Sequence, residues 1–413
     1  MELPIPVIQE ADVLLVGGTL AGCALAPRLR RAGRRVVMAC EDVALGTDCA
    51  GVLEREAQSA FPGLGPFATP GECQEGLERL LLGQGVTLHF GAFPLRPLRE
   101  RGGRRIAGWV FLGQEGFFAI AAKAVVDATR EGRLPVQARL LRPPAGLATC
   151  RLHWNLLGSA PPRENEGIRL EASLSPVHFP EGCLPLCHCQ RSLRLREDDM
   201  PARLEAEAAL RLALWTPSLR QGARWCTLES PAPRPAAPAP TAQAPLFSAQ
   251  TPCAPAILQA TLPHLPMPRQ LLAGEHPRKL PRGTELLPLP QQRPQDSPTL
   301  PFPLECLVGP APDAPLVILG AEEAGQQAAL QAARQGRPPL LLEESGLPHT
   351  PLHTLQEARG ARLWLHCRPA GLLLQDRRLA GILVVCATGE SRLVHTPRLL
   401  DTRTTPRTLL PSP

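Results

Sequence analysis

Short apolar runs and helical patterns alternate in two stretches of the chain, one near each end. In the first stretch, the apolar runs 13–16 and 36–39 flank residues 20–32, whose apolar positions recur at helical spacing. In the second stretch, the apolar runs 316–319 and 340–342 flank a segment of the same kind. A continuous apolar run is typical of a parallel strand that is buried on both faces. We therefore expect each stretch to form a β-α-β unit.

The two stretches repeat the same landmarks at the same spacing. The matched pairs are Gly17 with Gly320, Gly22 with Gly325, Gly33 with Gly336 and Glu41 with Glu344. Two later landmarks follow in the same order: an Arg-Arg segment that ends at Gly108 and Gly381, and an apolar segment that ends at Asp127 and Asp401. A glycine turn between a strand and a helix is typical of a dinucleotide-binding, Rossmann-like unit. The repeat therefore predicts two related Rossmann-like units.

The remaining patterns complete an α/β fold in four parts. Residues 1–134 are expected to form the first Rossmann-like unit, and residues 135–230 a middle region of mixed α/β structure. Residues 231–310 are dense in proline, which lacks a backbone donor, so we expect a linker or a disordered segment there. Residues 311–413 are expected to form the second unit. Further elements are predicted at 77–82, 86–90, 106–110, 117–121, 125–127, 150–157 and 201–215.

Composition excludes several classes of function. The net charge is +6, but the arginines are scattered and aromatic residues make up only 4% of the chain, so we expect no nucleic-acid surface. Lysine occurs only at Lys123 and Lys279 and tyrosine is absent, as the codon usage of a GC-rich genome would produce. No apolar run of about 18 residues is present, so no membrane span is expected.

Cysteine usage predicts the compartment. The N-terminal residues lack the basic and apolar regions of a cleavable leader. The 13 cysteines are therefore expected to be free thiols of a cytoplasmic protein.

The glycine turn of the first unit has the chemistry of a phosphate site. Residues 17–22 read Gly-Gly-Thr-Leu-Ala-Gly, where a glycine at the strand end permits a sharp turn. The missing side chains let a pyrophosphate approach the backbone, and the helix N-terminus supplies N–H groups and partial positive charge. The alternative is a strand-to-helix turn with a structural role only.

Three separated motifs resemble the FAD-dependent oxidoreductases that have an N-terminal, glutathione-reductase-like flavin domain. They are residues 12–22, Leu45-Gly46, and Val125-Val126-Asp127-Ala128-Thr129, in the order in which that family has them. The resemblance implies bound FAD. It also implies cofactor-binding roles for Gly17, Gly18, Thr19, Ala21, Gly22, Glu41, Gly46 and Thr129. Glu41 would hold the adenosine ribose, and Thr129 would lie near the cofactor.

The sequence also departs from the family pattern at several positions. Cys40 stands where the family has the ribose-binding acid, with Glu41 one residue later on what would be the opposite face of the strand. Arg130 replaces the glycine after Asp-Ala-Thr, and the second glycine of the Leu-Gly-Gly loop is absent. Pro27 lies inside the predicted helix, where it removes a hydrogen bond. These departures favour an alternative: a degenerate, non-catalytic Rossmann scaffold.

The second unit is expected to be a structural copy that does not bind NAD(P)H. Glu322 and Glu323 occupy its glycine turn, where their charges would repel a phosphate. We expect Ala324, Ala328 and Ala332 to pack under its strands.

A third class of function, a zinc-bearing interaction protein, rests on cysteines of the middle region. Cys183, Cys187, His188 and Cys189 lie close together in the sequence, but their spacing matches no standard zinc motif. We therefore expect no metal site. The sequence therefore predicts an FAD-dependent oxidoreductase acting on a small-molecule substrate. The sequence leaves the substrate, the catalytic acid or base and the oligomeric state open.

Overall fold

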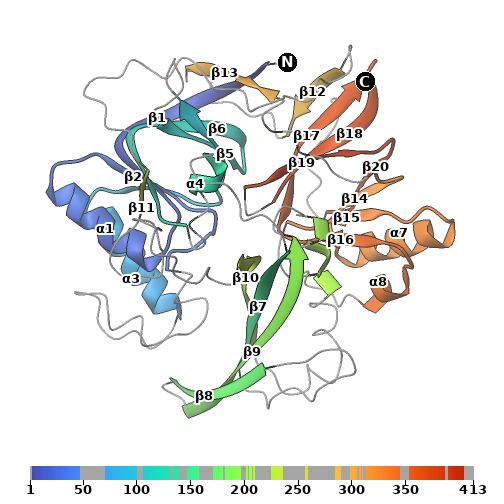
Figure 1. Ribbon diagram of the computed structural model, residues 1–413, viewed down its shortest axis with the longest axis horizontal. Coiled ribbons are helices and arrows are strands. Elements are labelled where there is room, and N and C mark those ends of the chain that lie inside the picture. The colour runs from blue at the N-terminus through green and yellow to red at the C-terminus, as the bar shows by residue number, and fades with distance from the viewer. Residues whose placement is uncertain are drawn as a thin grey trace.

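The computed structural model describes both ends of the chain in most detail. The described residues are 2–46, 70–99, 106–129, 132, 134–138, 147–157, 171–179, 182–196, parts of 201–209, 225–235, 256–258, 284–289, 298–304, 307, 309, 313–344, 353–386 and 389–403, with gaps at 203, 207, 305–306, 308 and 387–388. For the strands between 147 and 258 the description is of the backbone. The helices α1 and α3 lie at one side of the molecule, and α7 and α8 at the opposite side, with the sheets between them (Figure 1).

The first unit is built on a sheet whose central strands are parallel. The order is β3-β2-β1-β6, and β5 and β4 extend it in antiparallel fashion beyond β6. The strands are β1 (Glu2–Val16), β2 (Val36–Ala39), β3 (Thr87–His89), β4 (Phe93–Arg99), β5 (Ile106–Gly113) and β6 (Gly116–Asp127). The helices are α1 (Leu20–Arg31), α3 (Pro70–Gly83) and the short α4 (Leu134–Gln137). The predicted β-α-β unit is therefore present.

Alternation along the central strands divides the first unit into three layers. Leu15 and Met38 pack on one face of the sheet with the helix residue Leu77. Leu14, a neighbour of Leu15 in sequence, packs on the other face with Trp109 of β5. Both faces of a parallel strand are thus covered, which is why β1 and β2 are apolar at every position near the glycine turn.

A second parallel sheet near the C-terminus has the same strand order. Strands β14 (Val317–Leu319), β15 (Leu340–Leu342), β16 (Arg362–Trp364) and β20 (Leu399–Asp401) are arranged β16-β15-β14-β20. When Gly17 is aligned with Gly320, the helix α7 (Glu323–Arg334) begins and ends at the positions equivalent to the ends of α1. The helix α8 is His353–Glu357. An antiparallel sheet, β12 (Thr284–Pro288), β17 (Cys367–Gln375), β18 (Arg378–Cys386) and β19 (Ser391–His395), accompanies these strands.

The face of α7 that packs on the sheet agrees with our expectation in part. Ala332 is buried and Ala328 packs against a buried cluster, but Ala324 is exposed. Gly325 must lie against the glycine turn because a Cβ there would be 2.0 Å from the Gly320 carbonyl oxygen. In helix α1, Cys23 and Ala26 are the most deeply buried apolar side chains.

The segment 231–310 is not the uniform linker that its prolines predicted. Strand β13 (Thr299–Pro303) pairs antiparallel with the start of β1, and β12 pairs with β17. Strand β11 (Ala256–Leu258) pairs with the end of β6. Among the described strands β13 pairs only with β1, and an edge strand tolerates proline because the missing N–H is not needed.

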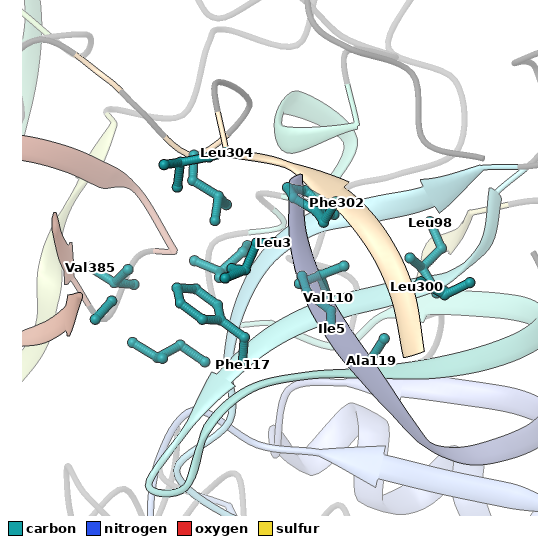
Figure 2. Close-up of a cluster of buried hydrophobic side chains, with 14 of the residues drawn as sticks. Leu3, Ile5, Leu98, Val110, Phe117, Ala119, Leu300, Phe302, Leu304 and Val385 are labelled. Atoms are coloured by element: carbon teal, nitrogen blue, oxygen red, sulfur yellow. The ribbon is translucent and has the colours of Figure 1, made fainter. Parts of the chain in front are cut away.

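One hydrophobic core joins the two ends of the chain, and we call it the shared core. Its members from the first unit and β13 include Leu3, Ile5, Leu95, Leu98, Val110, Leu112, Phe117, Ala119, Leu300, Phe302 and Leu304. Ala370, Leu383 and Val385 come from β17 and β18. Figure 2 shows Val385 at this cluster on the side of the C-terminal strands, with Phe302 and Leu300 on β13 beside β1.

The shared core brings equivalent residues of the two halves together. When Gly108 is aligned with Gly381, Val110 corresponds to Leu383 and Leu112 to Val385. All four of these side chains are buried in the shared core. The two halves therefore meet through matching strands, as the subunits of a two-fold symmetric dimer do.

The middle region forms an antiparallel sheet of its own. Its strands are β7 (Leu147–Leu157), β8 (Glu171–Phe179), β9 (Gly182–Arg196) and β10 (Trp225–Pro235), in the order β10-β7-β9-β8. The strand expected at 150–157 lies within β7, and the described residues among 201–209 are helical, as the pattern there indicated. None of the described helices is long and apolar enough to cross a membrane.

We expect Phe302→Ala to destabilise the full chain by about 3–5 kcal/mol, because it empties a fully buried site of the shared core. Urea unfolding followed by circular dichroism measures the change. The matched control is Leu82→Ala on α3, where the side chain is 59% exposed and the cost should be about 0.5 kcal/mol or less. Equal effects of the two substitutions would show that β13 does not belong to the core.

Candidate functional site

The predicted site residues gather at one edge of the first sheet. Gly17 follows β1 directly, Glu41 lies two residues beyond the end of β2, and Thr129 lies two residues beyond the end of β6. Because β1, β2 and β6 are parallel, their carboxyl ends share this edge, where ligands of open α/β sheets bind. Gly18, Thr19, Ala21 and Gly22 form the turn and the first turn of α1, and the Gly46 N–H donates to the Gly18 carbonyl oxygen at 2.7 Å.

The glycines of the turn are required first by packing. Gly17 has φ +110°, and a Cβ on it would lie 2.1 Å from the Ala128 carbonyl oxygen. A Cβ on Gly22 would lie 2.8 Å from the Ala128 Cβ. The two residues therefore let α1 and the turn approach the end of β6.

Thr19 is the N-cap of α1, not an open position of the turn. Its hydroxyl donates to the Ala128 carbonyl oxygen at 2.9 Å and accepts from the Gly22 N–H at 3.4 Å. A threonine is thus suited to this place because an N-cap hydroxyl satisfies one of the first N–H groups of the helix. The first turn of α1 contains no acidic side chain, so its partial positive charge is not offset locally.

The two glycine turns differ in what lies beneath them. In the second unit, the Glu343 carboxylate accepts a hydrogen bond from the Ala321 N–H at 2.8 Å. The corresponding residues of the first unit are Cys40 and Gly18. The Gly18 N–H has no acceptor among the residues that the structure describes.

Cys40 closes the space below the first turn without supplying a charge. Its sulfur would lie 3.0 Å from a Cβ on Gly18, and the residue is only 1% exposed. Burial raises the pKa of the Cys40 thiol well above its usual value, and the nearby Cys23 and Asp42 raise it further. Cys40 is therefore a neutral thiol at neutral pH and cannot replace a ribose-binding carboxylate.

Glu41 lies where the chain leaves the second strand. β2 ends at Ala39, and residues 41–45 form a bend. The bend removes the strand geometry that would turn Glu41 to the face opposite Cys40, since only in a regular strand do adjacent residues face opposite sides. The Glu41 side chain is half-buried at the same edge as the glycine turn.

Asp127 organises the loop that faces the glycine turn, and the sequence did not single it out as a site residue. One carboxylate oxygen accepts from the Thr129 N–H at 2.9 Å and from the Thr129 hydroxyl at 2.6 Å. The other accepts from the Leu134 N–H at 3.0 Å. The signal in the sequence was the threonine two residues after Asp127. A buried aspartate needs nearby hydrogen-bond donors, and Thr129 supplies two of them. Thr129 is accordingly 3% exposed and held by Asp127.

The corresponding edge of the second sheet is covered by an arginine. The Arg403 side chain lies over Gly320, with its Cγ 3.1 Å from where a Cβ would be. Its guanidinium pairs with both carboxylate oxygens of Asp401 and, at 2.9 Å, with Glu344. Burial alone would lower the pKa of Arg403, but Asp401 and Glu344 raise it, so the arginine stays charged. The space above this glycine turn is thus occupied by the chain itself.

Arg368 links this ion-pair cluster to the first unit. Its Nε donates to Glu344 at 3.3 Å, and its guanidinium carbon lies 4.7 Å from the centre of the Phe93 ring. Its Nη1 also donates to the Gly91 carbonyl oxygen at 3.5 Å. The edges of the two parallel sheets therefore meet near Arg368.

Some residues singled out in the sequence lie outside the description. Arg130 is not among the described residues. Cys183, Cys187, His188 and Cys189 all lie on strand β9, and their side chains are also outside the description.

Comparisons with known proteins give a weak likeness. No protein-family model matches the sequence, and no curated protein matches it. Among solved structures, the chain is similar to OxyS anhydrotetracycline hydroxylase from Streptomyces rimosus, at 16% identity and a TM-score of 0.32 over 53% of this chain and 52% of that one. It is also similar to a flavoprotein/dehydrogenase from Cytophaga hutchinsonii, at 18% identity and a TM-score of 0.30 over 44% and 56%.

A third similar structure is a geranylgeranyl bacteriochlorophyll reductase-like protein from Thermoplasma acidophilum, at 14% identity and a TM-score of 0.35 over 54% and 66%. The chain spans about half the length of several of the structures that it resembles. A likeness at this level says nothing about the chemistry of this chain.

The packing role of the glycines can be tested without any cofactor. We expect Gly17→Ala to destabilise the chain by about 3 kcal/mol or more, because the new Cβ meets the end of β6 and the backbone conformation is strained. Gly33→Ala is the matched control, since Gly33 has φ +75° but open space around it, and should cost about 1–2 kcal/mol. Urea unfolding of the cofactor-free protein measures both. If the Gly17→Ala protein is as stable as the control, packing does not require glycine at this position, and only a ligand would explain it.

Proposed function

We propose that the chain is an FAD-dependent oxidoreductase and that the first unit binds the cofactor. The observation that carries the proposal is the contrast between the two turns. The Ala321 N–H is satisfied by Glu343, while the Gly18 N–H has no acceptor among the described residues. A backbone N–H beside a helix N-terminus is a favourable partner for the oxygen of a pyrophosphate.

The residues of the first turn fit the pyrophosphate of a dinucleotide. Gly17 and Gly18 present backbone without side chains, Thr19 fixes the start of α1, and Ala21 and Gly22 keep its first turn small and uncharged. Gly46, hydrogen-bonded to Gly18, holds the following loop beside the turn. Thr129, fixed by Asp127, borders the same edge. Bound flavin would supply hydride or electron transfer, and the protein would bind, orient and shield it.

The ribose end of the site departs from the usual arrangement. The buried, neutral Cys40 cannot accept hydrogen bonds from ribose hydroxyls as a carboxylate would. We assign that role to Glu41, which lies where the chain bends after β2. Cys40 would instead pack under Gly18 and keep the turn in place.

The second unit, in this proposal, is a structural copy of the first. Glu343 fills the anion position under its turn, Arg403 covers the turn, and Glu323 adds negative charge to the first turn of α7. Its function is then to supply β17 and β18 to the shared core and Arg368 to the contact with the first unit.

Flavin binding can be tested by giving the first turn the negative charge that the second one has. We expect Ala21→Glu to weaken FAD binding at least about tenfold, since a carboxylate at the helix start repels the pyrophosphate. The matched control is Ala324→Glu at the equivalent, exposed position of α7, which should leave FAD binding unchanged. Titration of the full chain with FAD, followed by flavin fluorescence, measures both.

The FAD titration and an elemental analysis together separate the rival functions. If the folded wild-type chain leaves FAD fluorescence unchanged at any concentration, the flavoprotein proposal fails and the degenerate scaffold is favoured. About one zinc per chain in elemental analysis would favour the interaction protein instead. Equal loss of FAD affinity in the two variants would contradict the assignment to the first unit.

The structural role of the second unit predicts that it does not bind a nicotinamide cofactor. Calorimetric titration of the full chain with NADPH should show no saturable binding in the micromolar range at this unit, because Glu343 and Arg403 occupy the turn. Micromolar binding that survives Ala21→Glu and is lost in Ala324→Glu would place a nicotinamide site there and overturn this assignment.

A further inference from the structure

Two cysteines lie directly opposite each other across the hairpin of β17 and β18. Cys367 is the first residue of β17, Cys386 is the last residue of β18, and the two are paired in the antiparallel register. They therefore stand at the open end of the hairpin, away from the turn at Asp376 and Arg377. Nothing in the proposed flavin chemistry uses either residue.

The hydrogen bonds of these two residues define the kind of pair they form. The Cys367 N–H donates to the Glu343 carbonyl oxygen at 2.9 Å, and the Cys386 N–H donates to the Glu390 carbonyl oxygen at 2.9 Å. Since neither N–H is directed to the opposite cysteine, this is a non-hydrogen-bonded pair. In such a pair the Cα atoms are about 4.5 Å apart and the side chains approach most closely.

This separation falls within the range that a disulfide requires, which is about 4.4–6.8 Å between Cα atoms. Both side chains point to the same apolar core, where Cys367 is 0% and Cys386 is 1% exposed. Both are free cysteines, and the Cys367 sulfur donates to the Leu365 carbonyl oxygen at 3.2 Å. Residues directly opposite on one face of a sheet need no change of register to react with each other.

We propose that Cys367 and Cys386 form a reversible thiol–disulfide pair. A peroxide oxidises one thiol to a sulfenic acid with release of one water, and the second thiol then displaces the hydroxyl group as a second water. The S–S bond forms, both S–H bonds break, and the two electrons reduce the O–O bond of the peroxide. In the cytoplasm that the sequence predicts, the resting form is the dithiol.

The position of the pair gives the bond a consequence. Cys367 is held by Glu343, whose carboxylate binds the second glycine turn, and is followed by Arg368, which contacts Gly91 and Phe93 of the first unit. A disulfide would tie the open end of the hairpin at the point where the two units meet. Because both thiols are buried, oxidation proceeds through local opening of the hairpin end and is slower than that of exposed thiols.

The test uses the full chain treated with hydrogen peroxide, then denatured in iodoacetamide and digested with trypsin. Cys367 and Cys386 fall in the tryptic peptides 363–377 and 379–392, which each contain a single cysteine. We expect a cross-linked peptide that is lighter than the two reduced peptides by two hydrogen atoms and that disappears on reduction. The oxidised protein should also unfold at a higher urea concentration than the reduced one, because the bridge restricts the unfolded hairpin.

The variants Cys367→Ala and Cys386→Ala should each lose the cross-link and leave the remaining cysteine alkylated. The matched control is Cys73→Ala, which removes a buried cysteine of another core and should keep the cross-link. Circular dichroism of each reduced variant establishes that it is folded. Recovery of both cysteines fully alkylated from folded, oxidised wild-type protein would overturn the proposal, as would a cross-link from either one to another cysteine. Neither result depends on whether FAD binds.

Discussion

The shared core is the contact on which the arrangement of this chain depends. It is made by the start of β1, the antiparallel strands β4, β5 and β6, the edge strand β13, and side chains of β17 and β18. Removing apolar surface from water is non-directional, so the core needs only that these faces be apolar and fit together. Its effect is nevertheless specific, because it places segments nearly 300 residues apart in sequence side by side, as Ile5 and Leu300 are. The carboxyl edges of the two parallel sheets are brought near each other as a result.

The two glycine turns show how one backbone arrangement supports different chemistry. In both, the first glycine has a positive φ and the last glycine lets a helix approach the turn or the neighbouring strand. Beneath the turn, however, one unit has a neutral cysteine and the other a carboxylate. A buried carboxylate needs donors, and the nearest one is the N–H that an anionic ligand would otherwise use. A single side chain at the end of the second strand thus separates a turn that is open to an anion from one that satisfies itself.

Charge reinforces this difference at the surface of the second turn. Arg403 is held by Asp401 and Glu344, and Arg368 shares Glu344 while it stacks on Phe93. Both arginine side chains are largely buried, so removal of one partner would leave a charge without compensation. The cluster therefore serves as a fixed joint between the halves, and the covalent pairing proposed for Cys367 and Cys386 would act beside it.

Local patterns were sufficient for the strands and helices next to the glycine turns. The apolar runs at 13–16, 36–39 and 340–342 and the helix beginning at Leu20 are found where the periodicity placed them, because a buried parallel strand and a helix leave marks within a few residues. The repeat was visible for the same reason. Of the alanines expected to face the sheet from α7, Ala332 is buried but Ala324 is exposed, since the helix approaches the turn most closely at Gly325, a contact between elements.

The sequence by itself determined the α/β class, the two glycine turns and the candidate residues around the first of them. The tertiary structure decided what these residues can do: that Thr19 caps the helix, that Asp127 fixes Thr129, and that Arg403 covers Gly320. It also decided that part of the proline-rich segment is a strand of the shared core. Proline density predicts poor hydrogen bonding along the segment, but only a partner strand at one edge makes that loss tolerable. Such partners come from distant parts of the chain, and no local pattern records them.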